Sequence, residues 1–247
     1  MNKYTTCLSS LMFGAVVMIT VATAEAYAGR QDGVVLGSTR LILTPSKRTV
    51  PLSIYNGTER AWLTQVRVLD TGEHESPLFT ALPPLFRLEA GSDAQVRVLA
   101  TGQPETYPFD REGIWYVHVL TIPASAYPDK EEEAVSSLRV SFESVIKLFW
   151  RPASLKAPTA KEYRLVTFTR AGGKVRGCNL TRYYQSFGYL EFDGHRVDLN
   201  LQPSMLAPLA CETFSTTGQQ VRWAMINDYG GSSEIFSARV SDDSVTK

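Results

Sequence analysis

Hydrophobic and polar residues alternate with a period of two through most of the chain, which is typical of β-strands with one buried face. Val50, Leu52 and Ile54 follow this pattern, and Asn56-Gly57 then marks a turn. The same pattern predicts further strands over residues 38–43, 62–68, 95–98, 114–122, 137–150, 163–169, 189–192, 195–201, 221–226 and 234–240.

The predicted strands fall into two groups. The longest, over residues 137–150, ends just before Pro152, and residues 153–158 interrupt the pattern like a linker. No segment shows a sustained helical period with capping residues. Turns at intervals of roughly 8–12 residues are typical of all-β sandwiches. The sequence therefore predicts an all-β protein with two sandwich domains.

The N-terminal residues predict a secretory signal peptide. Lys3 precedes an apolar run from Leu8 to Ala22, and small residues up to Ala28 fit a cleavage site. The run is shorter than the roughly 20 residues that span a bilayer, so cleavage after residues 1–28 is favoured over an uncleaved anchor. No other stretch approaches that length, and we expect no membrane insertion after cleavage.

Cleavage would also change the number of cysteines from three to two. Cys7 would leave with the signal peptide, and Cys178 and Cys211 would remain as an even pair in an oxidising compartment. We expect these two to form a disulfide, with two free thiols as the alternative.

Charge and composition exclude several classes of protein. The 247 residues contain 25 Lys+Arg and 25 Asp+Glu, and 44% are hydrophobic. A neutral chain argues against a nucleic-acid-binding protein, which needs a basic surface. The apolar fraction is enough to build packed cores and argues against disorder.

Motifs for catalysis are absent from the sequence. There is no GxSxG nucleophile motif, and His74, His118 and His195 lack the HExxH spacing of a zinc protease. Residues 173–175 (Gly-Lys-Val) lack the Ser or Thr of a phosphate-binding loop. We therefore expect no enzyme, no cofactor and no metal site.

The predicted strand over residues 137–150 carries two unusual features. Leu138, Val140 and Phe142 form an alternating apolar row, which fits an ordinary half-buried strand or a strand offered to a partner. Lys147 lies in an apolar run, as Arg40 does in the first strand. Each is either an exposed edge charge or part of a shared anion site.

At this point the chain resembles a known family, the PapD-like periplasmic pilus-assembly chaperones. The resemblance rests on motifs that occur in the family's order: Thr39-Arg40, Pro83-Pro84, Arg87-Leu88, Asp110-Arg111-Glu112, Ile146 to Pro152, and Ile226 to Gly231. It implies two immunoglobulin-like β-sandwiches joined by a short linker in an L or boomerang arrangement. The domains would span residues 29–152 and 153–247.

The resemblance also implies a function in the periplasm. Such a chaperone lends a strand to each incomplete pilus subunit and delivers the subunit to an outer-membrane usher without ATP, which is donor-strand complementation. Leu138, Val140 and Phe142 would then enter the subunit groove, and Arg40 and Lys147 would bind the subunit's C-terminal carboxylate. The donor row could also mediate self-association of the free chaperone.

The same resemblance assigns Glu112, Arg151 and Asp228 to a salt-bridge network between the domains. It gives no role to the disulfide beyond stability, and it does not account for the acidic run over residues 129–133.

Two other functions stay open from the sequence. One is a secreted two-domain binding module for a protein or carbohydrate ligand, with the tryptophans as sugar contacts: Trp62, Trp115, Trp150 and Trp223. The other is a secreted hydrolase built on a β-sandwich.

Overall fold

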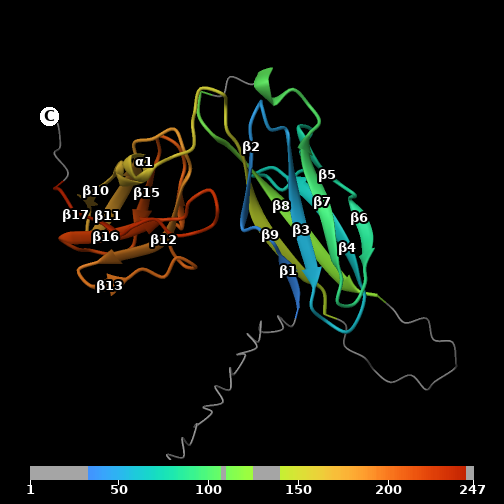
Figure 1. Cartoon of the computed structure of the whole chain (residues 1–247). Helices are drawn as coiled ribbons and strands as arrows, with labels where there is room; N and C mark the ends of the chain where they lie inside the picture. Colours follow the sequence, from blue (N-terminus) through green and yellow to red (C-terminus); the bar gives the residue numbers. More distant parts are fainter. Residues whose placement is uncertain (1–32, 107–109, 125–139, 243–247) are drawn as a thin grey trace, which may run out of the picture. The chain divides into compact units, whose positions relative to one another are not determined.

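The computed structural model describes residues 33–106, 110–124 and 140–242. The predicted signal peptide, the acidic run at 129–133 and Leu138 lie outside these residues. The described chain folds into two β-sandwiches, which confirms the predicted all-β, two-sandwich architecture (Figure 1). Within these residues, no helix is long and apolar enough to cross a membrane.

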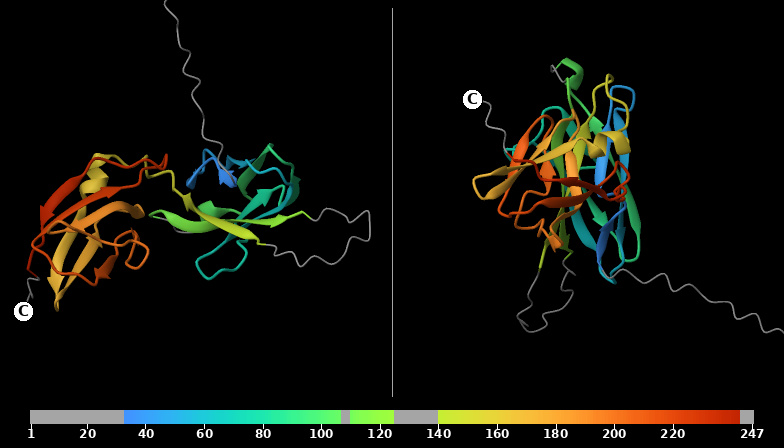
Figure 2. Two further views of the ribbon diagram at one scale, coloured as in Figure 1. Left: turned by 90° about the horizontal axis from the view of Figure 1, so that it is seen from below. Right: turned by 90° about the vertical axis from the view of Figure 1, so that its left-hand side faces the viewer.

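The first sandwich contains strands β1 to β9. One sheet has the order β1-β3-β7-β5 and the other has the order β2-β9-β8-β4-β6. Figure 2 shows the strands of each sandwich as two facing layers. The bounds are β1 Val34–Leu36, β2 Arg40–Leu43, β3 Thr49–Asn56, β4 Trp62–Leu69, β5 Phe79–Leu82, β6 Leu85–Leu88, β7 Asp93–Ala100, β8 Gly113–Pro123 and β9 Phe142–Trp150, with a 3₁₀ turn at Pro104–Thr106.

Alternating side chains from both sheets build the first core, as the sequence pattern predicts. Leu52 and Val96 come from one sheet, and Val117 and Leu148 come from the other. All four are fully buried, and along β3 buried residues alternate with exposed ones. This packing fixes which face of β9 points inward.

The N-terminal segment changes sheets at Gly37, and this leaves one strand edge open. β1 pairs with β3 in one sheet, whereas β2 pairs in parallel with residues 147–150 of β9 in the other. A Cβ atom at Gly37 would lie 3.2 Å from the Cβ of Ser53, so the crossing point is tight. Residues 142–146 of β9 therefore pair only with β8 among the described strands.

The second sandwich contains α1 and strands β10 to β17. Its sheets have the orders β10-β11-β15 and β13-β12-β16-β17, with β14 beside β12. The predicted disulfide is confirmed: Cys178 and Cys211 are bonded and lie opposite each other on β11 and β15. The bounds are α1 Ala160–Arg164, β10 Val166–Ala171, β11 Lys174–Asn179, β12 Gln185–Phe192, β13 His195–Arg196, β14 Met205–Leu206, β15 Cys211–Phe214, β16 Gln220–Met225 and β17 Phe236–Arg239.

Two predicted strands of this sandwich are wrong in part. Tyr163 belongs to the short helix α1, because Thr159 and Glu162 form a reciprocal capping box that starts a helical turn there. The strand predicted over residues 195–201 ends at Arg196. Asp198 instead accepts the backbone N–H of Asn200 and begins a turn.

The strand predicted over residues 137–150 is shorter in its described part. It begins at Phe142, and Val140 precedes it without regular pairing. Residues 137–139 are outside the described chain.

Candidate functional site

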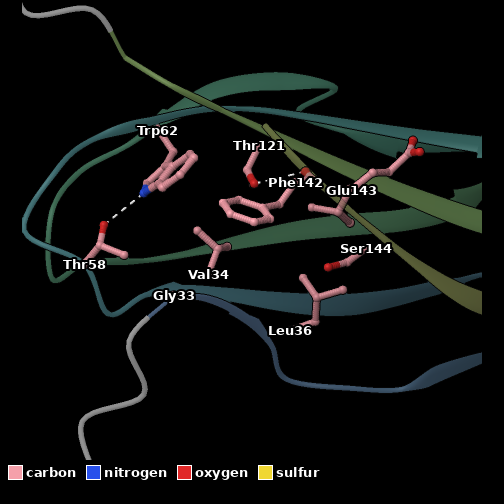
Figure 3. Close-up of a pocket in the computed structure, with 10 residues that line it drawn as sticks. Gly33, Val34, Leu36, Thr58, Trp62, Thr121, Phe142, Glu143 and Ser144 are labelled. Atoms are coloured by element: carbon pink, nitrogen blue, oxygen red, sulfur yellow. Dashed lines mark hydrogen bonds between the residues drawn. The ribbon is translucent and has the colours of Figure 1, made fainter. Parts of the chain in front are cut away.

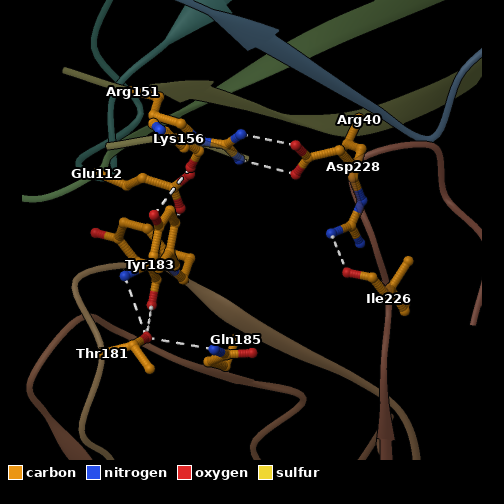
Figure 4. Close-up of polar contacts among 10 residues, drawn as sticks. Arg40, Glu112, Arg151, Lys156, Thr181, Tyr183, Gln185, Ile226 and Asp228 are labelled. Carbon is orange, nitrogen blue, oxygen red and sulfur yellow. Dashed lines mark hydrogen bonds and ion pairs between the residues drawn. The ribbon is translucent and has the colours of Figure 1, made fainter. Parts of the chain in front are cut away.

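Arg40 and Lys147 lie side by side on two neighbouring strands. They are register partners in the parallel pair of β2 and β9, although 107 positions separate them in the sequence. Both reach across to the second sandwich. Arg40 Nη1 donates to the backbone oxygen of Ile226 at 3.1 Å, and Lys147 Nζ donates to Ser186 Oγ at 3.2 Å (Figure 4 shows the arginine contact).

The two cations lie in poorly solvated surroundings, and neither forms a salt bridge with a carboxylate of the described residues. Arg40 is only 9% exposed, and its Nε atom has no hydrogen-bond acceptor in the described chain. Burial, reinforced by the charge of Arg40, lowers the pKa of Lys147 from 10.5 to about 8. Burial also lowers the pKa of Arg40. Two desolvated cations with spare donors favour an anion between them.

Arg151 joins two acidic residues that are far apart in the sequence. Its Nε donates to Glu112 Oε1 at 2.7 Å, and its two terminal nitrogens donate to the Asp228 carboxylate at 2.7 and 2.8 Å (Figure 4). Arg151 also lies 5.5 Å from the ring centre of Tyr183. The structure thus brings together all three residues of the network expected from the resemblance and links the two sandwiches through them.

The electrostatics of this network follow from its burial. Desolvation raises the pKa of Glu112, and the Arg151 charge opposes this rise. Burial would lower the pKa of Arg151, but hydrogen bonds and charges from Asp228 and Glu112 raise it and keep the guanidinium charged. The second oxygen of Glu112 accepts the backbone N–H of Tyr184 at 2.9 Å. The buried carboxylate therefore has hydrogen-bond donors on both oxygens.

The turn that carries Asp228 packs against Thr39, the residue just before β2 and Arg40. Asn227 Oδ1 accepts the backbone N–H groups of Tyr229 and Gly231, both at 3.0 Å. Gly230 has φ +83°, and a Cβ there would lie 2.5 Å from Thr39 Oγ1. Both conformation and space therefore favour glycine at this position.

The open edge of β9 exposes an apolar row. Val140 is 47% exposed and Phe142 is 59% exposed, although the Phe142 ring centre lies 5.9 Å from that of Trp62. Phe142 and Trp62 line a cavity of about 520 Å³, together with Val34 and Leu36 of β1 (Figure 3). The entry of these side chains into a partner's groove stays a prediction.

Sequence reasoning missed the groups of the second sandwich that contact the two cations. Ser186 carries no recognisable signal. Ile226 begins one of the motifs of the resemblance, but its contact with Arg40 uses a backbone carbonyl, which no side-chain pattern marks. Ser186 and Ile226 lie next to each other because the N–H of Ile226 donates to the carbonyl of Ser186 at 2.8 Å. Only the folded structure shows this pairing.

The tryptophans considered as sugar contacts do not lie at the protein surface. Trp62, Trp115, Trp150 and Trp223 are all buried, with at most 8% of each residue exposed. A tryptophan that stacks on a sugar must present a ring face to solvent. Among the described residues, no cluster of His, Cys, Asp and Glu could hold a metal ion.

Comparison with known proteins covers both sandwiches. The family model for the PapD N-terminal domain of pili and flagellar-assembly chaperones matches residues 33–156. The model for the C-terminal domain of the pili assembly chaperone PapD matches residues 161–237.

Known relatives and solved structures agree with these matches. The probable fimbrial chaperone YadV of Escherichia coli K12 is 31% identical over 221 residues, which cover 81% of this chain and 87% of the relative. The E. coli chaperone DraB superposes with a TM-score of 0.74 at 28% identity and covers 85% of this chain and 97% of its own. A structure of the Salmonella enterica SafA pilin in complex with the SafB chaperone also matches, with a TM-score of 0.74 at 27% identity. The match covers 86% of this chain and 99% of the matched chain.

Proposed function

The chain belongs to the PapD family of pili-assembly chaperones, and we propose that it binds pilus subunits in the periplasm by donor-strand complementation. In this proposal it delivers them to an outer-membrane usher. No ATP and no catalytic residue take part. A related structure that contains a pilin bound to its chaperone supports the choice of partner.

The observation that carries the proposal is the open edge of β9 with a cation pair at one end. Within the described part of the chain, residues 142–146 pair with β8 on one side and with no strand on the other, and Lys147 follows them on β9 with Arg40 beside it on β2. A strand can pair along this edge while its terminal carboxylate binds the two cations. Phe142 lies five residues before Lys147, or about 16 Å along an extended strand, so the anchor would set the register of the pairing.

The apolar row would supply most of the binding energy. Each large side chain that becomes buried in a subunit groove contributes roughly 1.5–3 kcal/mol before the costs of association. Val140 and Phe142 are exposed in the free protein, so this energy is still available. Leu138 would extend the row by one position.

We further propose that Glu112, Arg151 and Asp228 hold the two sandwiches in the orientation that binding needs. Ile226 and Asp228 are two positions apart, so one segment of the second sandwich contacts both Arg40 and Arg151. The network would then fix the second sandwich against the anion site.

A carbohydrate-binding module is the second candidate, and the structure gives it little support. It would need an exposed aromatic platform, whereas all four tryptophans are buried. Binding through the open strand edge uses features that the protein does expose.

The test is a periplasmic pull-down of the tagged protein from its own host, with bound chains identified by mass spectrometry. We expect the wild type to hold subunit-sized chains, and Lys147→Ala and Arg40→Ala to lose them. Lys174→Ala removes an exposed lysine of β11 and serves as the matched control that keeps them.

Loss of subunits only in the two anchor variants would support the function and the anchor together. Retention in both would reject the anchor. A wild type without subunits, in cells that express the pilus genes, would reject the function.

A further inference from the structure

The contact between Lys147 and Ser186 gives the second sandwich a part in the anion site. Ser186 lies on β12 and is only 2% exposed, and its Oγ accepts a hydrogen bond from Lys147 Nζ at 3.2 Å. Its backbone carbonyl accepts the N–H of Ile226, whose own carbonyl accepts from Arg40. Two adjacent backbone segments thus present one acceptor to each cation.

We propose that Ser186 is a positioning residue of the carboxylate site, which holds the ammonium group of Lys147 in place for the subunit's C-terminus. This inference rests on the proposed function. A hydroxyl can accept a hydrogen bond from the ammonium and still donate its own proton. The same oxygen can therefore also donate to a carboxylate oxygen that binds Lys147.

The electrostatic surroundings make this acceptor important. The ammonium is poorly solvated and lies beside the like charge of Arg40, and both effects favour its neutral form. An accepting oxygen favours the charged form, which is the form that binds a carboxylate. In the described chain, the other ionisable groups near the pair include Tyr116 opposite Lys147 on β8, Tyr184 beside Tyr116, Tyr163 of α1, and the network of Glu112, Arg151 and Asp228.

The first measurement is the pKa of Lys147 itself, by NMR of the full mature protein labelled with ¹³C at the lysine ε-carbon. Loss of the signal in Lys147→Arg assigns it. We expect Ser186→Ala to lower this pKa by roughly half a unit or more, and Ser186→Thr to restore it because the hydroxyl is kept. Ser237→Ala removes an exposed hydroxyl of β17 and should leave the pKa unchanged.

The second measurement is subunit capture by the same variants at pH 6 and pH 8. Ser186→Ala should capture less at pH 8 than at pH 6, relative to the wild type, and Ser186→Thr should match the wild type. A purely structural role of Ser186 would weaken capture equally at both values.

Three results would overturn the inference. The first is an unchanged pKa of Lys147 in Ser186→Ala, and the second is an equal fall of that pKa in Ser237→Ala. The third is a lowered Lys147 pKa in Ser186→Ala with subunit capture unchanged at both pH values. If the wild type captures no subunit at all, the proposed function fails. The NMR titration then decides by itself whether Ser186 holds the ammonium.

Discussion

Lys147 should destabilise the free protein at neutral pH, and Lys147→Met should therefore stabilise it. Its pKa falls from 10.5 to about 8, mainly through burial, which corresponds to at most roughly 3 kcal/mol. The side chain is only partly buried, and its hydrogen bond to Ser186 would be lost in the variant. After solvent screening and this loss are allowed for, we expect a gain of about 1 kcal/mol.

The pH dependence of this gain is a sharper test than its size. Between pH 8 and pH 10.5 the unfolded chain binds more protons at Lys147 than the folded chain does. The wild type should therefore become more stable with rising pH across this window, relative to Lys147→Met. Below pH 8 both states of the wild type are protonated, so the advantage of the methionine variant should be constant there.

Urea unfolding followed by tryptophan fluorescence, at intervals from pH 6.5 to 10.5, measures both effects. Lys174→Met is the matched control, since it replaces an exposed lysine of β11. A methionine variant that is less stable than the wild type at pH 7 would refute the reasoning. So would a stability difference that stays constant up to pH 10.5. The same variant should fail to hold subunits, because the anchor has lost a charge.

Two further predictions concern the junction between the sandwiches. Asp228→Ala removes both hydrogen bonds to the terminal nitrogens of Arg151, and the Asp228 side chain is only 24% exposed. The substitution should therefore lower the free energy of unfolding, measured in urea, by about 2–3 kcal/mol. A cost below about 0.5 kcal/mol would mean that Arg151 finds other partners. Gly230→Ala should cost about 1–3 kcal/mol, because the left-handed conformation and the contact with Thr39 both oppose a Cβ. Recovery of that loss by Thr39→Ala would identify the contact as the main cause, and an unchanged melting temperature in Gly230→Ala would contradict the prediction.

Long strands that alternate between a buried and an exposed face were predictable from sequence, whereas the six-residue strand β11 alternates in the same way and was not predicted. β3, β4 and β8 show this alternation over eight or more residues, so a period of two is clear. The helix α1 was not predictable in the same way, because five residues are too few to show a helical period. Only its capping residues mark it.

The site was predictable only in part, for a similar physical reason. Arg40 and Lys147 are unusual as charges in apolar strands, so each can be identified from sequence as a candidate site residue by itself. Their pairing depends on a parallel register between strands 107 positions apart, which no local pattern encodes; the family resemblance supplied it. The roles of Ser186 and Ile226 could not be identified from the sequence, since they contribute a hydroxyl and a backbone carbonyl whose positions depend on the fold.

The change of sheet at Gly37 also makes the length of the connection between β1 and β2 important for the site. Residues 37–39 form the whole connection between β1, whose register is set by β3, and β2, whose register is set by β9. The register of β2 is held by its own pairing with β9 and by buried Leu41 and Leu43, so the connection must match the distance between two independently fixed strands. A deletion here that shifted β2 by one position would turn Arg40 to the opposite face of its sheet, because side chains alternate along a strand.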